Sequence, residues 1–190
     1  MVEASSTVDA ADLGTRYLEL TRPRTGGTPR FTDKMPINYL YCGLIRRALP
    51  RAKVVHVVRH PLATAYALFK TLFNQGYPFS YDLAEIADYL VAYTKLMRHW
   101  RQRHPEWICD VSYERLVSDP LGESRRLYDF CGLEWQPEVV NIEARRAATT
   151  SASAAQVRRS IYGTSVDLWR HYSSQLEPVR SRLSEAGISL

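Results

Sequence analysis

The chain has 190 residues, 45% of them hydrophobic, and a formal net charge of +5, so it is long enough to bury the core of one domain without disulfides. Its lysines and arginines are scattered over several predicted helices, which disfavours nucleic-acid binding, because a basic stripe with interleaved aromatic residues is missing. The start is polar and acidic and no apolar run could span a bilayer, so we expect a protein without a membrane segment. Three cysteines without metal-ligand spacing indicate core packing in the reducing cytoplasm: Cys42, Cys109 and Cys131.

The N-terminal quarter predicts a disordered segment, a loop and a helix. Residues 1–12 lack hydrophobic periodicity, so we expect disorder there and one domain over residues 13–190. Residues 22–32 are rich in proline, glycine and threonine, which is typical of a loop. Pro36 suits the first turn of a helix, and Pro50 ends the apolar pattern that follows.

The most informative stretch is a valine-rich strand predicted at 53–58, followed at once by Arg59 and by a helix pattern over residues 62–74. The unbroken apolar run predicts a strand buried on both faces, and ligands of open α/β sheets bind at the carboxyl ends of such strands. Arg59 therefore stands where a phosphate would bind. The alternative is an arginine that caps the sheet edge or pairs with a carboxylate. We interpret His56 as a core residue and His60 as a turn former.

The second half repeats the alternation of strand and helix. Ser80 or Asp82 can cap the longest predicted helix, and a second buried strand is expected at 107–111. Asp119 and Gly132 are typical of the start and the end of the next helix. Because strands and helices alternate, we expect a parallel sheet.

Seven short blocks between residues 32 and 158 occur in an order that one protein family shares, and the similarity extends from about residue 17 to the C-terminus. They are TDKMPIN (32–38), VVRHPL (57–62), GYPFSYDL (76–83), LMRHW (96–100), VSYERLV (111–117), FCGLEW (130–135) and SAAQVR (153–158). On these blocks the chain resembles the sulfotransferases that use 3′-phosphoadenosine 5′-phosphosulfate (PAPS), especially the tetratricopeptide-linked and tyrosylprotein-type branch. The resemblance implies a three-layer α/β fold, with a short parallel sheet flanked by helices as in the P-loop kinases.

The resemblance also implies roles for individual residues, with PAPS as co-substrate, PAP as product and no metal. Lys34 matches the lysine on the transferring group and Ser153 matches a serine near the sulfonate, so these two are the expected catalytic residues. Arg59 matches the arginine that holds the 3′-phosphate, and Tyr113 matches a tyrosine on the nucleotide side of the pocket. Arg158 is expected to contact either the donor or only solvent. From the residues alone, Lys34 also fits a solvated loop, Tyr113 the core and Ser153 a loop hydroxyl.

Two departures from the family pattern bear on activity. The family usually has a serine eight residues after the arginine, but this position is Ala67, and Thr64 is the expected substitute for the missing hydroxyl. The Asp-Lys-Met-Pro block begins at residue 33, which leaves no room for the first strand, the loop that cradles the 5′-phosphosulfate, or the usual carboxylate base. Residues 23–28 contain glycines and hydroxyls, but their flanks do not predict the strand and helix that a cradle needs. We therefore expect a partial sulfotransferase domain without its first strand.

Two hypotheses for function follow. The first is an enzyme that moves sulfonate from PAPS to a hydroxyl or amine of an unidentified small molecule, glycan or protein tyrosine. The second is a non-catalytic remnant that binds PAP weakly or acts as an interaction module. A relative of the P-loop kinases is disfavoured, because the sequence has no Gly-Lys-Ser/Thr motif. The missing strand predicts an exposed sheet and hence self-association.

Overall fold

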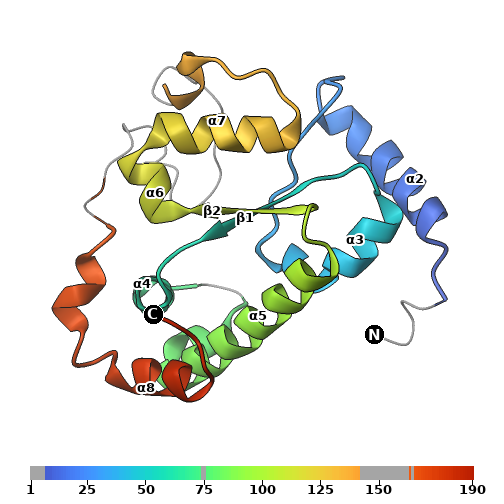
Figure 1. Ribbon diagram of the computed structural model, residues 1–190. Helices are drawn as coiled ribbons and strands as arrows, with labels where there is room; N and C mark the ends of the chain where they lie inside the picture. Colours follow the sequence, from blue (N-terminus) through green and yellow to red (C-terminus); the bar gives the residue numbers. More distant parts are fainter. Residues whose placement is uncertain (1–6, 74–75, 142–162, 164) are drawn as a thin grey trace.

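A two-stranded parallel sheet lies at the centre of the computed structural model, which describes residues 7–73, 76–141, 163 and 165–190 (Figure 1). The strand β1 (Val54–Val58) pairs with β2 (Ile108–Ser112) in a register that places Val54 opposite Ile108 and Val58 opposite Ser112. Parallel strands need a long crossover, and the helices between residues 59 and 107 supply it. The parallel sheet expected from the alternating elements is confirmed.

Helices cover the two sides of this sheet, which gives three layers (Figure 1). The helix α5 (Leu83–Arg103) runs on one side, and Tyr93 from this helix hydrogen-bonds His56 of β1. The helices α6 (Tyr113–Ser118) and α7 (Pro120–Cys131) lie on the other side, where the Arg126 side chain of α7 donates to the Asp110 carbonyl oxygen of β2 at 2.6 Å. The expected three-layer α/β architecture with a short sheet is therefore confirmed.

Helix ends follow the capping signals of the sequence. The Asp82 side chain accepts the backbone N–H groups of residues 84 and 85 at the start of α5, and Asp119 accepts that of residue 122 at the start of α7. Gly132 adopts a left-handed φ of 61° at the end of α7. The helix α4 (Pro61–Lys70) ends earlier than expected, because Thr71 is extended and no longer continues the helix. A 3-10 turn, η3 (Pro78–Tyr81), then leads into α5.

The N-terminal region is more ordered than predicted. The helix α2 (Ala10–Thr21) begins with Asp9, whose side chain caps the N–H groups of residues 11 and 12, so residues 10–12 are helical and the expected disorder reached too far. The short η1 (Arg22–Arg24) extends α2 into the predicted loop. The helix predicted from position 36 is split into η2 (Pro36–Tyr41) and α3 (Cys42–Ala48).

The strand β1 is buried on one face only, which corrects the expectation of burial on both. His56 is 9% exposed, but the neighbouring Val55 and Val57 are 41% and 57% exposed. Side chains alternate along a strand, so the face that carries His56 is covered by α5, whereas the valine face stays partly exposed among the described residues. The run of valines does not reveal how many neighbours the strand has.

The C-terminal segment completes the core beside α5. After η4 (Pro137–Val140), the described chain resumes before η6 (Leu168–Tyr172) and ends with α8 (Glu177–Glu185), which packs along α5 (Figure 1). The fully buried side chains of this core come from α4, α5 and α8, and include Leu62, Ile86, Val179 and Leu183. None of the helices in the described ranges is long and apolar enough to cross a membrane.

Candidate functional site

Arg59 and Tyr113 lie next to each other at the carboxyl end of the sheet. The last paired residues of the two strands are Val58 and Ser112, so the register delivers the following residue of each chain segment to the same edge. The Arg59 guanidinium carbon lies 4.9 Å from the centroid of the Tyr113 ring, which is a cation–π contact. The two residues expected to bind the nucleotide are therefore brought together by the parallel pairing itself.

Ser165, a residue from the C-terminal part of the chain, closes this cluster. Arg59 Nη2 donates to the Ser165 carbonyl oxygen at 2.5 Å, and the hydroxyl oxygens of Tyr113 and Ser165 lie 2.7 Å apart within one hydrogen bond. Sequence reasoning missed Ser165, because it is 106 positions from Arg59 and follows the last block of the family resemblance. A hydroxyl residue shortly after that block is the only signal that the sequence offers for it.

Arg59 retains an unused hydrogen-bond donor. Its Nε is buried and has no hydrogen-bond partner within the part of the chain that the structure describes. In the same residues it forms no ion pair, so the alternative of a structural pairing between Arg59 and a carboxylate is not observed there. Buried donors without a partner are rare, and such a group at a strand end fits an anionic ligand.

His60 and Glu114 hold the two strand ends together beside Arg59. The His60 N–H donates to Glu114 Oε1 at 2.8 Å, and the Ser112 hydroxyl donates to Glu114 Oε2 at 3.1 Å. Burial opposes ionisation of Glu114, but these hydrogen bonds outweigh it and lower its pKa. His60 Nδ1 accepts the Leu62 N–H at 3.2 Å as the cap of α4, which confirms a turn-forming role. Its ring stacks on Trp169 at 4.5 Å, and burial lowers its pKa.

A partly buried polar network lies three residues before the site on each strand. His56 and Asp110 are directly paired in the sheet, and His56 Nδ1 donates to Asp110 Oδ1 at 2.6 Å. His56 Nε2 then accepts from the Tyr93 hydroxyl. Arg101 of α5 forms an ion pair with Asp110, with 2.7 Å between Nε and Oδ2. His56 is therefore a satisfied core histidine as expected, and it links α5 to both strands.

Within the described residues, neither Lys34 nor Thr64 is hydrogen-bonded or ion-paired to Arg59, Tyr113 or Ser165. Lys34 lies in the exposed loop before η2, and within the described residues it makes no hydrogen bond, ion pair or cation–π contact. Its neighbour Asp33 is fixed by the Tyr17 hydroxyl, which donates to Asp33 Oδ2 at 2.6 Å. The Thr64 hydroxyl donates to the His60 carbonyl oxygen of its own helix at 3.2 Å. Ser153 and Arg158 lie outside the described residues.

Comparison with known proteins identifies the family. A family profile described as the sulfotransferase family matches residues 2–137. This chain belongs to the sulfotransferase family. A protein of Aquifex aeolicus (strain VF5), described as uncharacterized, is 34% identical over 172 residues, which cover 89% of this chain and 23% of that protein. The chain thus spans about a quarter of the length of that protein.

A solved structure supports the sulfotransferase fold. The sulfotransferase domain from the curacin biosynthetic pathway matches with a TM-score of 0.63 and 18% sequence identity. The match covers 93% of this chain and 68% of that domain. At this identity the match speaks for the fold, and it agrees with the family assignment. In the described residues no group of three or more His, Cys, Asp or Glu side chains is arranged to hold a metal.

Proposed function

We propose that this chain binds PAPS through Arg59 and takes part in the transfer of its sulfonate group to a hydroxyl or amine acceptor. Membership in the sulfotransferase family supports the reaction class. The observation that carries the nucleotide assignment is the buried, unpartnered Nε of Arg59 at the carboxyl end of β1. The 3′-phosphate of the nucleotide would supply the missing acceptor, and the assignment of residues 13–190 as a partial sulfotransferase domain remains our prediction.

The surroundings of Arg59 suit a phosphate in a fixed orientation. One edge of the guanidinium is held by Ser165 and its face rests on the Tyr113 ring, so the side chain is ordered before the ligand arrives. Glu114 interacts electrostatically with Arg59 without forming an ion pair, and its oxygens accept from His60 and Ser112. A guanidinium that is already oriented loses little conformational entropy on binding, which favours affinity.

Lys34 is our proposed catalytic residue, on the basis of the family motif. In the proposed step, the bond between sulfur and the bridging phosphate oxygen of PAPS breaks while the acceptor oxygen or nitrogen bonds to sulfur. The electron pair of the broken bond stays on the phosphate of PAP, where a lysine ammonium stabilises the charge. The acceptor proton leaves to a base, which is not among the residues that we assign. Ser153, near the sulfonate, and Arg158, at the donor, remain predictions from the same motif.

Calorimetric titration with PAP tests the nucleotide site. Arg59→Met removes donors to a charged phosphate, and such bonds are worth about 1.5–3 kcal/mol, so the dissociation constant for PAP is expected to rise roughly 10- to 150-fold. Arg47→Met is the matched control, because Arg47 is exposed on α3 and outside the cluster. Absence of PAP binding by the unaltered chain, or equal weakening in both variants, would remove the proposal.

A non-catalytic PAP-binding remnant is the second candidate, and two residues of α4 favour it. Ala67 offers no hydroxyl at the position where the family usually has a serine. Thr64, the expected substitute, already donates to the His60 carbonyl oxygen and would have to rotate to reach a phosphate. Incubation with PAPS labelled in the sulfonate and a panel of phenol, sugar and amine acceptors distinguishes the two. Labelled product that forms with the unaltered chain but not with Lys34→Met supports an enzyme. PAP binding without labelled product supports a non-catalytic remnant.

We also propose self-association through the valine face of β1. Val55 and Val57 are large apolar side chains that remain 41% and 57% exposed on a sheet. Gel filtration over a range of concentrations is expected to reveal oligomers that Val57→Lys dissociates. Leu20→Lys, a control on an exposed apolar residue of α2, should leave them intact, and monomers at all concentrations would contradict the proposal. The acceptor class and the cytoplasmic location remain predictions.

A further inference from the structure

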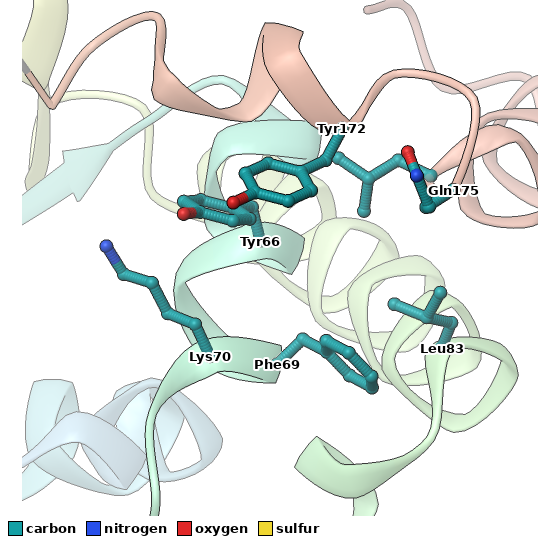
Figure 2. A pocket seen from close by; sticks show the side chains of 7 residues that line it. Tyr66, Phe69, Lys70, Leu83, Tyr172 and Gln175 are labelled. Atoms are coloured by element: carbon teal, nitrogen blue, oxygen red, sulfur yellow. The ribbon is translucent and has the colours of Figure 1, made fainter.

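A separate cavity of about 310 Å³ lies between α4, the start of α5, and the end of η6 with the segment after it (Figure 2). It shares no residue with the Arg59 cluster. Its lining includes Tyr66, Phe69, Lys70, Leu83, Tyr172 and Gln175. Its volume is at the lower end of the range of small-molecule sites, so it suits a ligand of one or two rings.

The lining combines polar groups at two ends with an apolar side. Figure 2 shows the Lys70 ammonium and the Tyr66 hydroxyl on one side, and the Gln175 amide on the opposite side. Phe69 and Leu83 lie on the lower side of this view, and their carbon atoms offer no hydrogen bond. This distribution selects a flat apolar body with a polar group at its edge.

One wall of the cavity is held in place by contacts between its own side chains. The rings of Tyr66 and Tyr172 stack with their centroids 4.9 Å apart and an interplanar angle of 21°. The Lys70 ammonium lies 4.8 Å from the centroid of the Tyr66 ring and is thereby held near the cavity. Within the described residues Lys70 forms no ion pair, so its positive charge is not neutralised by a neighbouring carboxylate there.

The cavity also leaves aromatic surface for an occupant to cover. Phe69 and Tyr172 are 47% and 45% exposed, although Tyr172 stacks on Tyr66. Covering such carbon removes it from water and adds the dispersion contacts that an unfilled space lacks. A ring placed against Phe69 would gain both, and its charged substituent would face Lys70.

We propose that this cavity is a second ligand site that binds an aromatic anion, with the ring against Phe69 and Leu83 and the anionic group at Lys70. The site goes beyond the proposed sulfonate transfer and does not depend on it, because none of its residues belongs to the nucleotide cluster. We expect PAP and the aromatic anion to bind at the same time.

The experiment uses the full chain and 2-naphthoate as the probe. Nuclear Overhauser contacts between naphthoate ring protons and the Leu83 methyl groups are expected, and they do not depend on any variant. Lys70→Met keeps the shape of the side chain but removes the charge, and should raise the dissociation constant about fivefold, as for a partly exposed ion pair. Lys95→Met, an exposed lysine in the middle of α5, is the matched control and should change nothing.

Three results would overturn the second site. They are the absence of contacts to Leu83 at saturating naphthoate, equal weakening in the Lys70 and Lys95 variants, and displacement of naphthoate by PAP. Repeating the titration in Arg59→Met separates this proposal from the nucleotide site, because naphthoate binding should persist when PAP binding is lost. Thermal midpoints measured for each variant identify any loss that is due to unfolding, and the contacts to Leu83 in the unaltered chain then decide.

Discussion

Replacement of Asp110 by asparagine tests how much the polar network beneath the site contributes to stability. Asp110 accepts from two donors, His56 Nδ1 at 2.6 Å and Arg101 Nη2 at 3.1 Å, and its second oxygen lies 2.7 Å from Arg101 Nε. Both hydrogen bonds are made to Oδ1. Asparagine is neutral and has one acceptor oxygen, so its NH2 group faces Arg101 Nε, or, with the amide reversed, it faces His56 Nδ1 and Arg101 Nη2. The His56 side chain is only 10% exposed, and water does not easily replace the lost partner.

The expected loss of stability follows from these contacts. A buried donor left without an acceptor costs about 1–3 kcal/mol, and we take the lower half of that range because the Asp110 side chain is 42% exposed. The ion pair with Arg101, which is 35% exposed, adds about 0.5 kcal/mol. The free energy of unfolding should therefore fall by about 2 kcal/mol, which lowers the melting temperature by about 4–8 °C in a domain of this size.

Thermal and urea unfolding of Asp110→Asn measure this loss, and Asp88→Asn provides the control. Asp88 of α5 also pairs with one arginine, Arg182 of α8 at 2.7 Å, but both partners are more than half exposed and no histidine is involved. Its replacement should change the free energy of unfolding far less, because exposed ion pairs contribute little. Equal losses in the two variants would refute the reasoning, because the buried contact with His56 would then add nothing.

The difference between Asp110→Asn and the unaltered chain should also depend on pH. Burial raises the pKa of Asp110, but the hydrogen bonds from His56 and Arg101 outweigh burial, so its pKa is lowered in the folded chain. A carboxyl with a lowered pKa stabilises the fold above its ordinary pKa of about 3.9, and this contribution is lost as the pH falls through the folded value. The two melting temperatures should therefore converge below about pH 4. A constant difference down to pH 2 would contradict this account.

Three further replacements test single contacts. Burial lowers the pKa of His60, so its neutral form stabilises the fold above about pH 6.5. The melting temperature should therefore fall as the pH is lowered to 5.5. The fall should be smaller in His60→Asn, because asparagine can still cap α4. Gly14→Ala would place a Cβ 2.0 Å from the Ala48 carbonyl oxygen, and should cost about 1–3 kcal/mol in urea unfolding unless α2 and α3 separate freely. Gly132→Ala places a side chain on a residue with a φ of 61°, so the free energy of unfolding should fall by about 1 kcal/mol. An unchanged free energy of unfolding would mean that the end of α7 relaxes.

The elements and their caps could be predicted because their signals are local. Asp82 and Asp119 each precede an amphipathic stretch, and their side chains satisfy the first N–H groups of α5 and α7. Disorder was predicted where α2 begins, because the polar residues around Asp9 resemble a disordered tail as much as a helix cap. The burial of β1 depends on how many strands and helices surround it. The valines at positions 55 and 57 are compatible with a wide sheet and with a narrow one. Their exposure could therefore not be predicted from the five residues of the strand.

The candidate site likewise contains residues whose positions could be predicted from the sequence and residues whose positions could not. Arg59 and Tyr113 each follow a predicted strand, and once the strands are parallel and in register their proximity needs no further information. Ser165 is recruited by folding of the C-terminal segment onto the sheet edge, a contact over 106 positions that no periodicity encodes. Lys34 illustrates the opposite case, because its motif is clear in the sequence while its side chain is exposed and unpaired among the described residues. A nucleotide that bridges Arg59 and Lys34 would join these two parts, so PAP should order the loop before η2, and amide hydrogen exchange of residues 31–35 with and without PAP measures this directly.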